Sequence, residues 1–392
     1  MTLTPPKPIR SDRRFIMSGG KSGIILLRRN YFRSVDYWLV IPILLLSLIG
    51  IYVLNKVLSS GFDDYPSILY RQAAAAVLGM AIALFICLID THFLKAIGWI
   101  IYIASILLLL LVFVDSFSMV DQWGADSWLN LPFIGTFQPS EIAKIGMIIV
   151  TAYYLEAIKN KEITIVKGFM FISLVDGLPL LMILRQPDFG TAMVIIFALM
   201  CMIFIWGIKY RYLFLGISAV IVGVIPILWN FVFTSIQKSR ILSFVFAGSD
   251  PKGEYNLIQA KKAIASGGLI GNRTGEVVNV PVKWADFIYT AISEHMGFIG
   301  TTMVVILAFF FLTRSIYVAS KASQKSYTYT VIGLAGAFAF HFIESMGMSV
   351  GLLPITGIPL PFISLGGSAL LVNFISFGII LNISMERSIE RN

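Results

Sequence analysis

Residues 280–300 read VPVKWADFIYTAISEHMGFIG and join a polar stretch to a long apolar run. At this boundary stands Asp286, with aromatic or apolar residues on both sides. Removing a carboxylate from water at the edge of an apolar segment is costly, so such a residue is usually retained for a function. The stretch therefore predicts a membrane helix that begins just after Asp286, and it makes this aspartate the first candidate for chemistry.

The composition is that of a membrane protein. Apolar residues make up 57% of the 392 residues and charged residues only 13%, with a mean hydropathy of +0.85. Soluble domains carry about 25% charged residues. Apolar runs of about 20 residues recur along the chain, which is typical of helical spans and not of a barrel. The sequence therefore predicts an all-α integral membrane protein, and its cysteines, Cys87 and Cys201, lie inside apolar runs without the pattern of a disulfide framework.

We predict ten transmembrane helices, with one long extracellular loop between helices 7 and 8. The chain divides into a basic N-terminal segment at 1–34, a membrane domain at 35–385 whose large loop covers about 234–286, and a tail at 386–392. Lys and Arg are concentrated in the segments that lie inside when the N-terminus is inside, which predicts both termini in the cytoplasm. The expected spans are 35–55, 70–89, 94–114, 140–158, 166–184, 189–207, 211–233, 287–313, 328–350 and 364–385.

The 234–286 loop is basic although it is predicted to lie outside, and its cations include Arg240, Lys261 and Lys262. A basic external loop opposes the usual topology bias, so we interpret it as an attractor for an anion. The alternative is a loop that faces solvent or lipid headgroups. Within the loop, residues 255–266 (YNLIQAKKAIAS) are amphipathic, and we expect a helix that lies at the membrane interface.

Glu141 and Lys144 stand three residues apart at the start of the predicted 140–158 span, in FQPSEIAK. This spacing puts them on one helix face within reach of each other. Both charges must face protein or water, because hydrocarbon does not solvate them. A functional pair and a structural ion pair between helices both fit the pattern.

The string RQPDFGTA at 185–192 joins two predicted spans. Pro187 breaks the helix, Asp188 is suited to cap the next one, and Gly190 permits a close approach. Arg185 adds a cation at an outer helix start, where backbone N–H groups also favour anions. Arg185 is therefore a candidate for phosphate binding, while capping alone would explain Asp188.

Residues 351–369 (GLLPITGIPLPFISLGGSA) contain three prolines and four glycines, so they cannot form a plain helix. Irregular backbone at membrane depth is tolerated where it is buried in protein or lines a cavity. His341 and Glu344 precede this segment, but two residues at one spacing are a weak metal signal, and a satisfied structural role is the alternative. We interpret the charged clusters as converging with Asp286 on one cavity that opens on the outer face.

Several strings occur in one order along the chain: FQPSEIAK, RQPDFGTA, DPKGEYNLIQAKKAIASGGLIG, ADFIYTAISEHMGFIG and GLLPITGIPLPFISLGGS. In this order they resemble the SEDS family of RodA, FtsW and SpoVE over about 35–385, and the 250–268 segment looks closer to RodA than to FtsW. The resemblance implies the SEDS fold and a peptidoglycan glycosyltransferase. It further implies polymerisation of lipid II into glycan strands on the outer face of the bacterial cytoplasmic membrane, for cell elongation, shape or division.

The resemblance also implies a site. Asp286 falls on the aspartate of the family motif TDFIF and would be the catalytic acidic residue, while Glu141, Lys144 and Asp188 fall on the charged positions of the PSE-x-x-K and QPD motifs. With the cations above and a serine of the 351–369 segment, the expected substrate-binding set is Glu141, Lys144, Arg185, Asp188, Arg240, Lys261, Lys262 and Ser364.

The implied partners are lipid II, a class B penicillin-binding protein and membrane lipids. A divalent cation, Mg²⁺ or Mn²⁺, could help the pyrophosphate leave, although no metal ligand set is assigned. The sequence contains no P-loop, no dinucleotide-binding fingerprint and no zinc-spaced Cys/His cluster, so neither a nucleotide cofactor nor a nucleic acid is expected.

Some positions depart from the family pattern. Val282 and Trp284 stand where the family usually has Glu and His, and Glu344 stands near the place of an Asn. We expect the fold to be kept, while the rate or the details of substrate binding differ. The alternatives to the enzyme are a lipid II flippase and a non-catalytic membrane scaffold for a transpeptidase.

Overall fold

A computed structural model describes most of the chain from residue 34 to residue 390. Arg240 and the basic 1–33 segment lie outside the described residues. The internal gaps are 60–64, 115–117, 120–126, 132–134, 187, 220–221, 224, 232, 234, 236–237, 240–241, 243–245, 247–250, 274 and 276.

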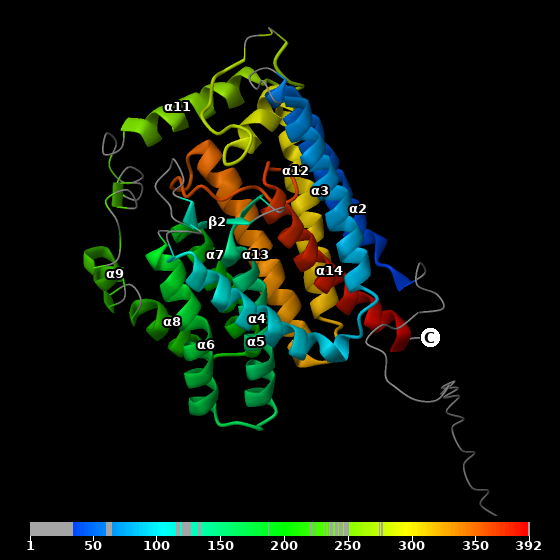
Figure 1. Cartoon of the computed structure of the whole chain (residues 1–392), viewed down its shortest axis with the longest axis vertical. Coiled ribbons are helices and arrows are strands. Elements are labelled where there is room, and N and C mark those ends of the chain that lie inside the picture. The colour runs from blue at the N-terminus through cyan, green and yellow to red at the C-terminus, as the bar shows by residue number, and fades with distance from the viewer. Residues whose placement is uncertain are drawn as a thin grey trace, which may run out of the picture.

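Long helices form one bundle, and a shorter helix lies across one of its ends (Figure 1). In the described part, 8 helices are long and apolar enough to cross a membrane, so the chain is a multi-pass, all-α membrane protein. They are α2 (Tyr37–Leu58), α3 (Tyr65–Ile86), η1 with α4 (Thr91–Phe93, Leu94–Leu111), α6 (Ile165–Arg185), α7 (Phe189–Trp206), α12 (Ile288–Ala319), α13 (Lys325–Val350) and α14 (Gly367–Glu390).

The other two predicted spans take different forms. α5 (Pro139–Lys159) matches the predicted 140–158 segment, but it carries four charged residues and is less apolar than the eight. The predicted 211–233 span contains α8 (Tyr210–Ala219) and α9 (Ile225–Phe231) instead of one long helix. At about 1.5 Å per residue neither crosses a bilayer alone, and Pro226 disfavours a continuous helix because it lacks an N–H group.

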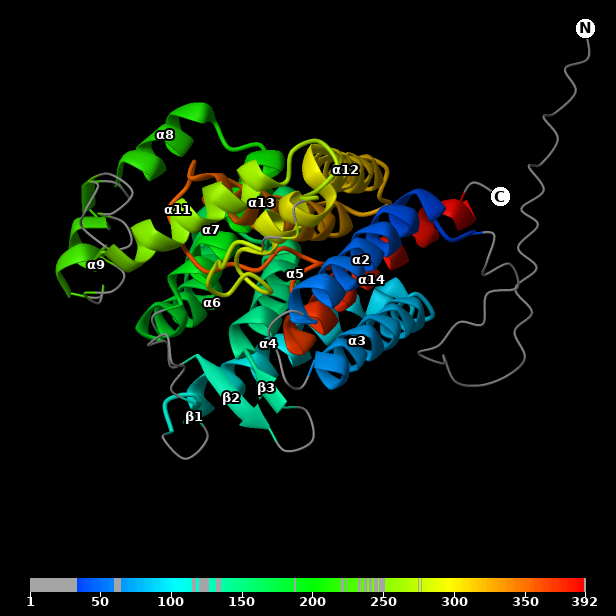
Figure 2. The same ribbon diagram turned by 90° about the horizontal axis from the view of Figure 1, so that it is seen from above.

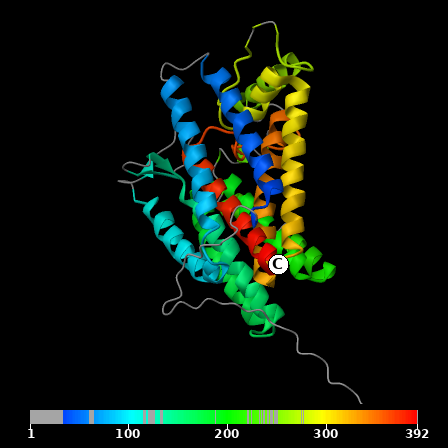
Figure 3. The same cartoon turned by 90° about the vertical axis from the view of Figure 1, so that its right-hand side faces the viewer.

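α13 is the central helix of the bundle. It packs against α5, α7 and α12, while α14 packs against α3 and α12 packs against α2. The view from above places α2, α3 and α14 together on one side and α6 and α7 on the other (Figure 2). From the side, α2, α3 and α12 run next to one another along the bundle (Figure 3).

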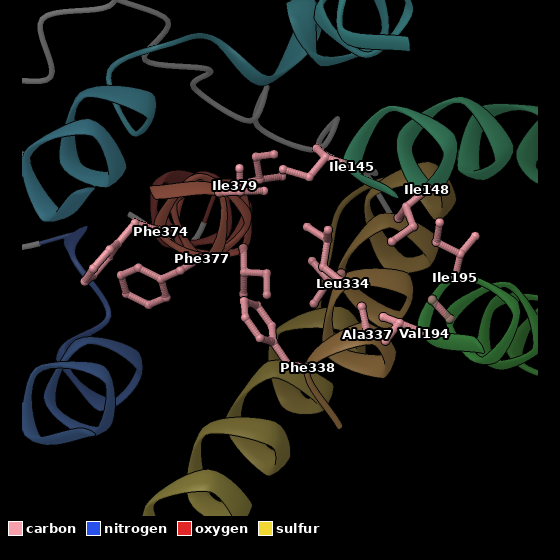
Figure 4. Packing of buried hydrophobic residues seen from close by; sticks show 14 of the residues in the cluster. Ile145, Ile148, Val194, Ile195, Leu334, Ala337, Phe338, Phe374, Phe377 and Ile379 are labelled. Atoms are coloured by element: carbon pink, nitrogen blue, oxygen red, sulfur yellow. The ribbon is translucent and has the colours of Figure 1, made fainter. Parts of the chain in front are cut away.

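The core between α5, α7, α13 and α14 is made of aliphatic and aromatic side chains (Figure 4). Small residues let α13 approach its neighbours, since a Cβ at Gly333 would lie only 2.6 Å from Ile148 and Met202. The labelled core residues are Ile145, Ile148, Val194, Ile195, Leu334, Ala337, Phe338, Phe374, Phe377 and Ile379.

A tyrosine compensates for a proline inside α6. Pro179 has no N–H to donate to the carbonyl of Val175, four residues earlier. Tyr102 of α4 donates its hydroxyl to that Val175 carbonyl at 2.9 Å. Because an unpaired carbonyl is costly in a membrane, this bond lets α6 continue to Arg185.

Residues 351–366 return into the bundle between α13 and α14 without regular structure, as the sequence predicts. Leu360 and Ile363 are 1% and 0% exposed. Phe362 has a positive φ of 65°, and its ring stacks on Phe338 with ring centroids 5.4 Å apart. Burial among aromatic side chains holds this unfavourable backbone in place.

A small antiparallel sheet, not predicted from the sequence, lies before α5. It has the order β1-β2-β3, with β1 (Ser118–Met119), β2 (Trp128–Leu131) and β3 (Gly135–Phe137). Leu129 of β2 pairs with both Ser118 and Phe137. The sheet leads directly into Gln138, the N-cap of α5.

Candidate active site

Asp286 lies on the turn 281–287, directly before α12. This confirms that a helix begins just after the aspartate. The Val282 carbonyl accepts from the backbone N–H groups of Ala285 at 3.1 Å and Phe287 at 3.4 Å. Val282 has a φ of 54°, which is unfavourable for a β-branched residue. The Asp286 side chain is half-buried, so this tight turn presents a carboxylate that solvent can still reach.

The 351–366 segment hydrogen-bonds to the backbone of this turn. The Leu365 N–H donates to the Trp284 carbonyl at 3.0 Å, and the Ser364 hydroxyl donates to the Ala285 carbonyl at 2.8 Å. Gly357 has a φ of 77°, and a Cβ there would lie 3.4 Å from Asp286 Oδ2. In the structure Ser364 therefore orients the backbone next to Asp286, while its contact with substrate stays a prediction.

The helix α11 (Pro251–Ser266) covers the same turn from above. Its buried residues Ala260 and Ala263 pack against Val280 and Phe287. The amphipathic helix that the sequence predicts is therefore present, and its apolar face packs on the segment that carries Asp286.

Lys261 and Lys262 of α11 are both exposed. Lys261 lies against Gly351, the C-cap of α13, where a Cβ would be 3.0 Å from Lys261 Nζ. A cation at a helix C-terminus is favourable, so Lys261 has a structural contact although its side chain is exposed.

Glu141 and Lys144 form an ion pair of 3.0 Å on α5 and are 4% and 3% exposed. Lys144 Nζ also lies 3.1 Å from Nε2 of His341 on α13. Lys144 thus joins α5 to α13, and the ion pair is closed off from solvent in this conformation. This differs from the expectation that Glu141 and Lys144 line one open cavity together with Asp286.

Asp188 caps α7, as the sequence predicts, by accepting from the Thr191 N–H at 3.1 Å. It also accepts from Gln138 Nε2 at 2.6 Å and from the Ser140 hydroxyl at 2.9 Å. Burial raises the pKa of the Asp188 carboxyl above its usual value, and the hydrogen bonds from Thr191 and Ser140 oppose that rise. Asp188 therefore ties the start of α5 to the start of α7, and Arg185 stays exposed at the end of α6.

The 356–358 stretch connects the two groups of candidate residues. The Thr356 hydroxyl donates to Glu344 Oε1 at 2.8 Å. A Cβ at Gly190 would lie 3.4 Å from the Thr356 carbonyl and 2.8 Å from Ile358. Because Gly357 adjoins Asp286, the structure brings the Asp188 turn, Glu344 and Asp286 to one segment.

Two contributors to the site were not found from the sequence. Lys283 falls within the basic 234–286 loop, yet it is buried and ion-paired with Glu294. Gln72 of α3 donates to the Ser364 carbonyl at 3.0 Å and accepts from the Gly366 N–H at 3.3 Å. Neither residue has a local pattern that could reveal these contacts, since their partners lie on other elements.

The geometry fits a membrane enzyme that works at the end of the bundle covered by α11 (Figure 1). A reachable carboxylate stands on a rigid turn, between a helix that covers it and an irregular segment that fills the bundle beneath it. Exposed cations on α6 and α11 favour an anionic substrate. Among the described residues, no group of three or more His, Cys, Asp or Glu is placed to hold a metal ion.

Comparison with known proteins gives the family. The sequence matches the FtsW/RodA/SpoVE family, described as "Cell cycle protein", over residues 34–389, and the chain belongs to this family, also called SEDS. It is 31% identical to the peptidoglycan glycosyltransferase MrdB of Escherichia coli strain K12, over 88% of this chain and 94% of MrdB.

Solved structures agree with this assignment. One of them is a chain from a study of the structural coordination of polymerization and crosslinking by a peptidoglycan synthase complex. It aligns with a TM-score of 0.76 at 28% identity, over 90% of this chain and 98% of that chain. The rod shape determining protein RodA of Thermus thermophilus aligns with a TM-score of 0.66 at 27% identity, over 90% and 97%. The fold is therefore the SEDS fold.

Proposed function

We propose that this protein polymerises lipid II into glycan strands on the outer face of the bacterial cytoplasmic membrane. It is a peptidoglycan glycosyltransferase, the activity of its curated relatives. The observation that carries the proposal is the half-buried carboxylate of Asp286, held on a hydrogen-bonded turn directly before α12.

In this mechanism Asp286 acts as the general base. It takes the proton of an acceptor sugar hydroxyl while that oxygen bonds to the anomeric carbon of the donor and the bond from that carbon to the pyrophosphate breaks. Pyrophosphate is a good leaving group, so one carboxylate suffices. The tight turn and α11 keep the carboxylate in one place, and this placement supplies much of the rate through orientation.

The exposed cations bind the pyrophosphate of the substrate in this proposal. Arg185 ends α6 three residues before Asp188, and Lys261 and Lys262 lie on α11, which covers the Asp286 turn. Arg240, outside the described residues, belongs to the same loop. Mg²⁺ and Mn²⁺ bind oxygen ligands, and Mg²⁺ usually takes one or two carboxylates plus substrate phosphates. The cation would supply charge that favours the leaving pyrophosphate.

We further propose that ten segments cross or line the membrane domain. They are the eight apolar helices, α5 and the 211–233 segment. The 1–34 segment and the 386–392 tail are then cytoplasmic, and α11 lies outside. A class B penicillin-binding protein is the proposed partner in elongation or division, because a similar chain occurs in a peptidoglycan synthase complex.

The deciding experiment is a gel assay for glycan strands made from the purified protein, lipid II and Mg²⁺ or Mn²⁺. We expect polymer whose amount increases with time. Absence of polymer, together with transfer of labelled lipid II across vesicles, would favour a flippase. Absence of both would leave a scaffold for the transpeptidase.

Neutralising Lys261 and Lys262 together, each to Gln, is expected to raise KM and leave kcat nearly unchanged. This is the result of lost uniform substrate binding. The effect should shrink as salt rises, because exposed charges are screened over about 8–10 Å at physiological ionic strength. Initial rates against lipid II concentration at low and high salt measure it.

The control is Lys209→Gln, which removes an exposed cation between α7 and α8 at the opposite end of the bundle. A lysine pair that only seats α11 on anionic headgroups would change activity in anionic bilayers but not in neutral detergent. An unchanged KM in neutral detergent would therefore contradict a role in substrate recruitment.

A further inference from the structure

We propose that Lys283 is a positioning residue for Asp286, and that its ion pair with Glu294 fixes one end of the turn that presents the carboxylate. The inference rests on the proposed catalytic role of Asp286. Lys283 is 4% exposed and Glu294 is 1% exposed, and Lys283 Nζ contacts Glu294 Oε2. With both charges out of water, each depends on the other for compensation.

The pair is part of a closed ring of hydrogen bonds. Glu294 Oε1 accepts from the Val278 N–H at 2.8 Å, and Lys283 Nζ donates to the Val278 carbonyl at 3.1 Å. Val278 and Lys283 are thus both held by one glutamate of α12. The chain is therefore tied at Val278, before the 281–287 turn, and at Lys283, inside it.

Glu294 lies on a part of α12 that is held by contacts with the loop 267–272. The helix breaks at Gly297, with φ 66° and ψ −161°, and the loop 267–272 fills the break. A Cβ at Gly267, Gly271 or Gly297 would overlap the backbone of the other segment. The bonds across the break are Phe298 N–H to the Gly268 carbonyl at 2.9 Å, Ile299 N–H to the Leu269 carbonyl at 3.1 Å and Asn272 N–H to the Glu294 carbonyl at 2.7 Å.

Lys283 connects this part of α12 to the turn that carries Asp286. It directly follows Val282, whose positive φ is unfavourable and persists only where the surroundings hold it. The far end of the turn is held by Leu365 and Ser364, so the Lys283–Glu294 pair supplies the near end. Without the pair the turn can relax at Val282 and move Asp286, and a displacement of about 1 Å can lower a rate by about 10²-fold.

The test uses two variants of the full-length protein in the lipid II assay, below the melting temperature of each. Lys283→Gln is expected to lower kcat by about 10- to 100-fold with little change in KM, and Lys283→Arg to keep most of the activity. The double variant Lys283→Met/Glu294→Gln strands no charge. We expect its kcat to fall as well, because the tie to the turn is gone.

A readout independent of activity is amide hydrogen exchange at Ala285 and Phe287. It should become faster in Lys283→Gln while the middle of α12 keeps its protection. The matched control is Arg314→Gln, which removes an ion pair of 2.7 Å with Asp36 at the far end of the bundle. It should lower stability without changing kcat.

A double variant with wild-type kcat and unchanged exchange at Ala285 and Phe287 would overturn the proposal and leave the pair a purely structural one. So would an equal loss of kcat in Arg314→Gln. Asp286→Asn is measured in parallel: if it still polymerises lipid II, the role of Asp286 fails, whereas an inactive Asp286→Asn beside a fully active Lys283→Gln refutes only the positioning role.

Discussion

Asp286→Asn is expected to abolish polymerisation of lipid II while the protein stays folded. Asparagine keeps the size of the side chain and one acceptor oxygen, but it cannot take a proton from the acceptor hydroxyl. Loss of a general base typically costs about 10²- to 10⁴-fold in rate. Because Asp286 is half-buried and sits on a turn that backbone hydrogen bonds define, the melting temperature should stay near that of the wild type.

Initial rates of strand formation measure the effect, and Asp90→Asn serves as the matched control. Asp90 caps the short helix η1 by accepting from the His92 N–H at 3.0 Å, and asparagine caps about as well. The control should therefore be active. An Asp286→Asn protein that keeps more than about a tenth of the wild-type rate would move the base to another group. Glu344, bonded to Thr356 next to Gly357, is then the next candidate.

Features with a local sequence pattern could be predicted. The start of α12 after Asp286, the amphipathic α11 and the Asp188 cap each follow from residues within a few positions of one another. The buried, irregular 351–366 segment also follows from its own prolines and glycines. In each case the period or the turn chemistry fixes the backbone before any distant contact forms.

Features that depend on distant partners could not be predicted. Lys144 meets His341, which is 197 residues away in the chain, and Gln72 bonds the carbonyl of Ser364, 292 residues away. Lys283 lies in the basic 234–286 loop, and nothing in its sequence neighbourhood shows that the chain turns back to Glu294. Burial of a charge is set by tertiary packing, which a single sequence does not reveal.

The 211–233 segment illustrates the same limit at the level of an element. Its apolar composition predicts a span, yet the described residues form the short helices α8 and α9. Side chains such as Phe214, Leu215 and Ile227 are exposed, so few tertiary contacts hold this part of the chain. Hydropathy alone reports that a segment prefers an apolar environment, and packing decides whether it becomes one straight helix.

Removing Lys144 is expected to destabilise the protein more than removing Lys144 and Glu141 together. Lys144→Met leaves the Glu141 carboxylate 4% exposed and without its cation, which costs about 3–5 kcal/mol of unfolding free energy. Glu141→Gln should cost less, because Lys144 keeps the His341 ring nitrogen at 3.1 Å. The double variant Glu141→Gln/Lys144→Met strands no charge and should lie between the wild type and Lys144→Met.

The measurement is thermal unfolding in detergent. It compares the wild type, both single variants and the double variant. The lipid II assay is run on the same samples, and the two readouts separate the roles that the sequence left open. A structural pair gives losses of stability that the double variant partly reverses, and activity that follows the folded fraction. Single variants as stable as the wild type but inactive would instead assign Glu141 and Lys144 to substrate binding. In that case the pair, closed in this conformation, would have to become accessible when lipid II binds, because a buried charge cannot contact a pyrophosphate without such an opening.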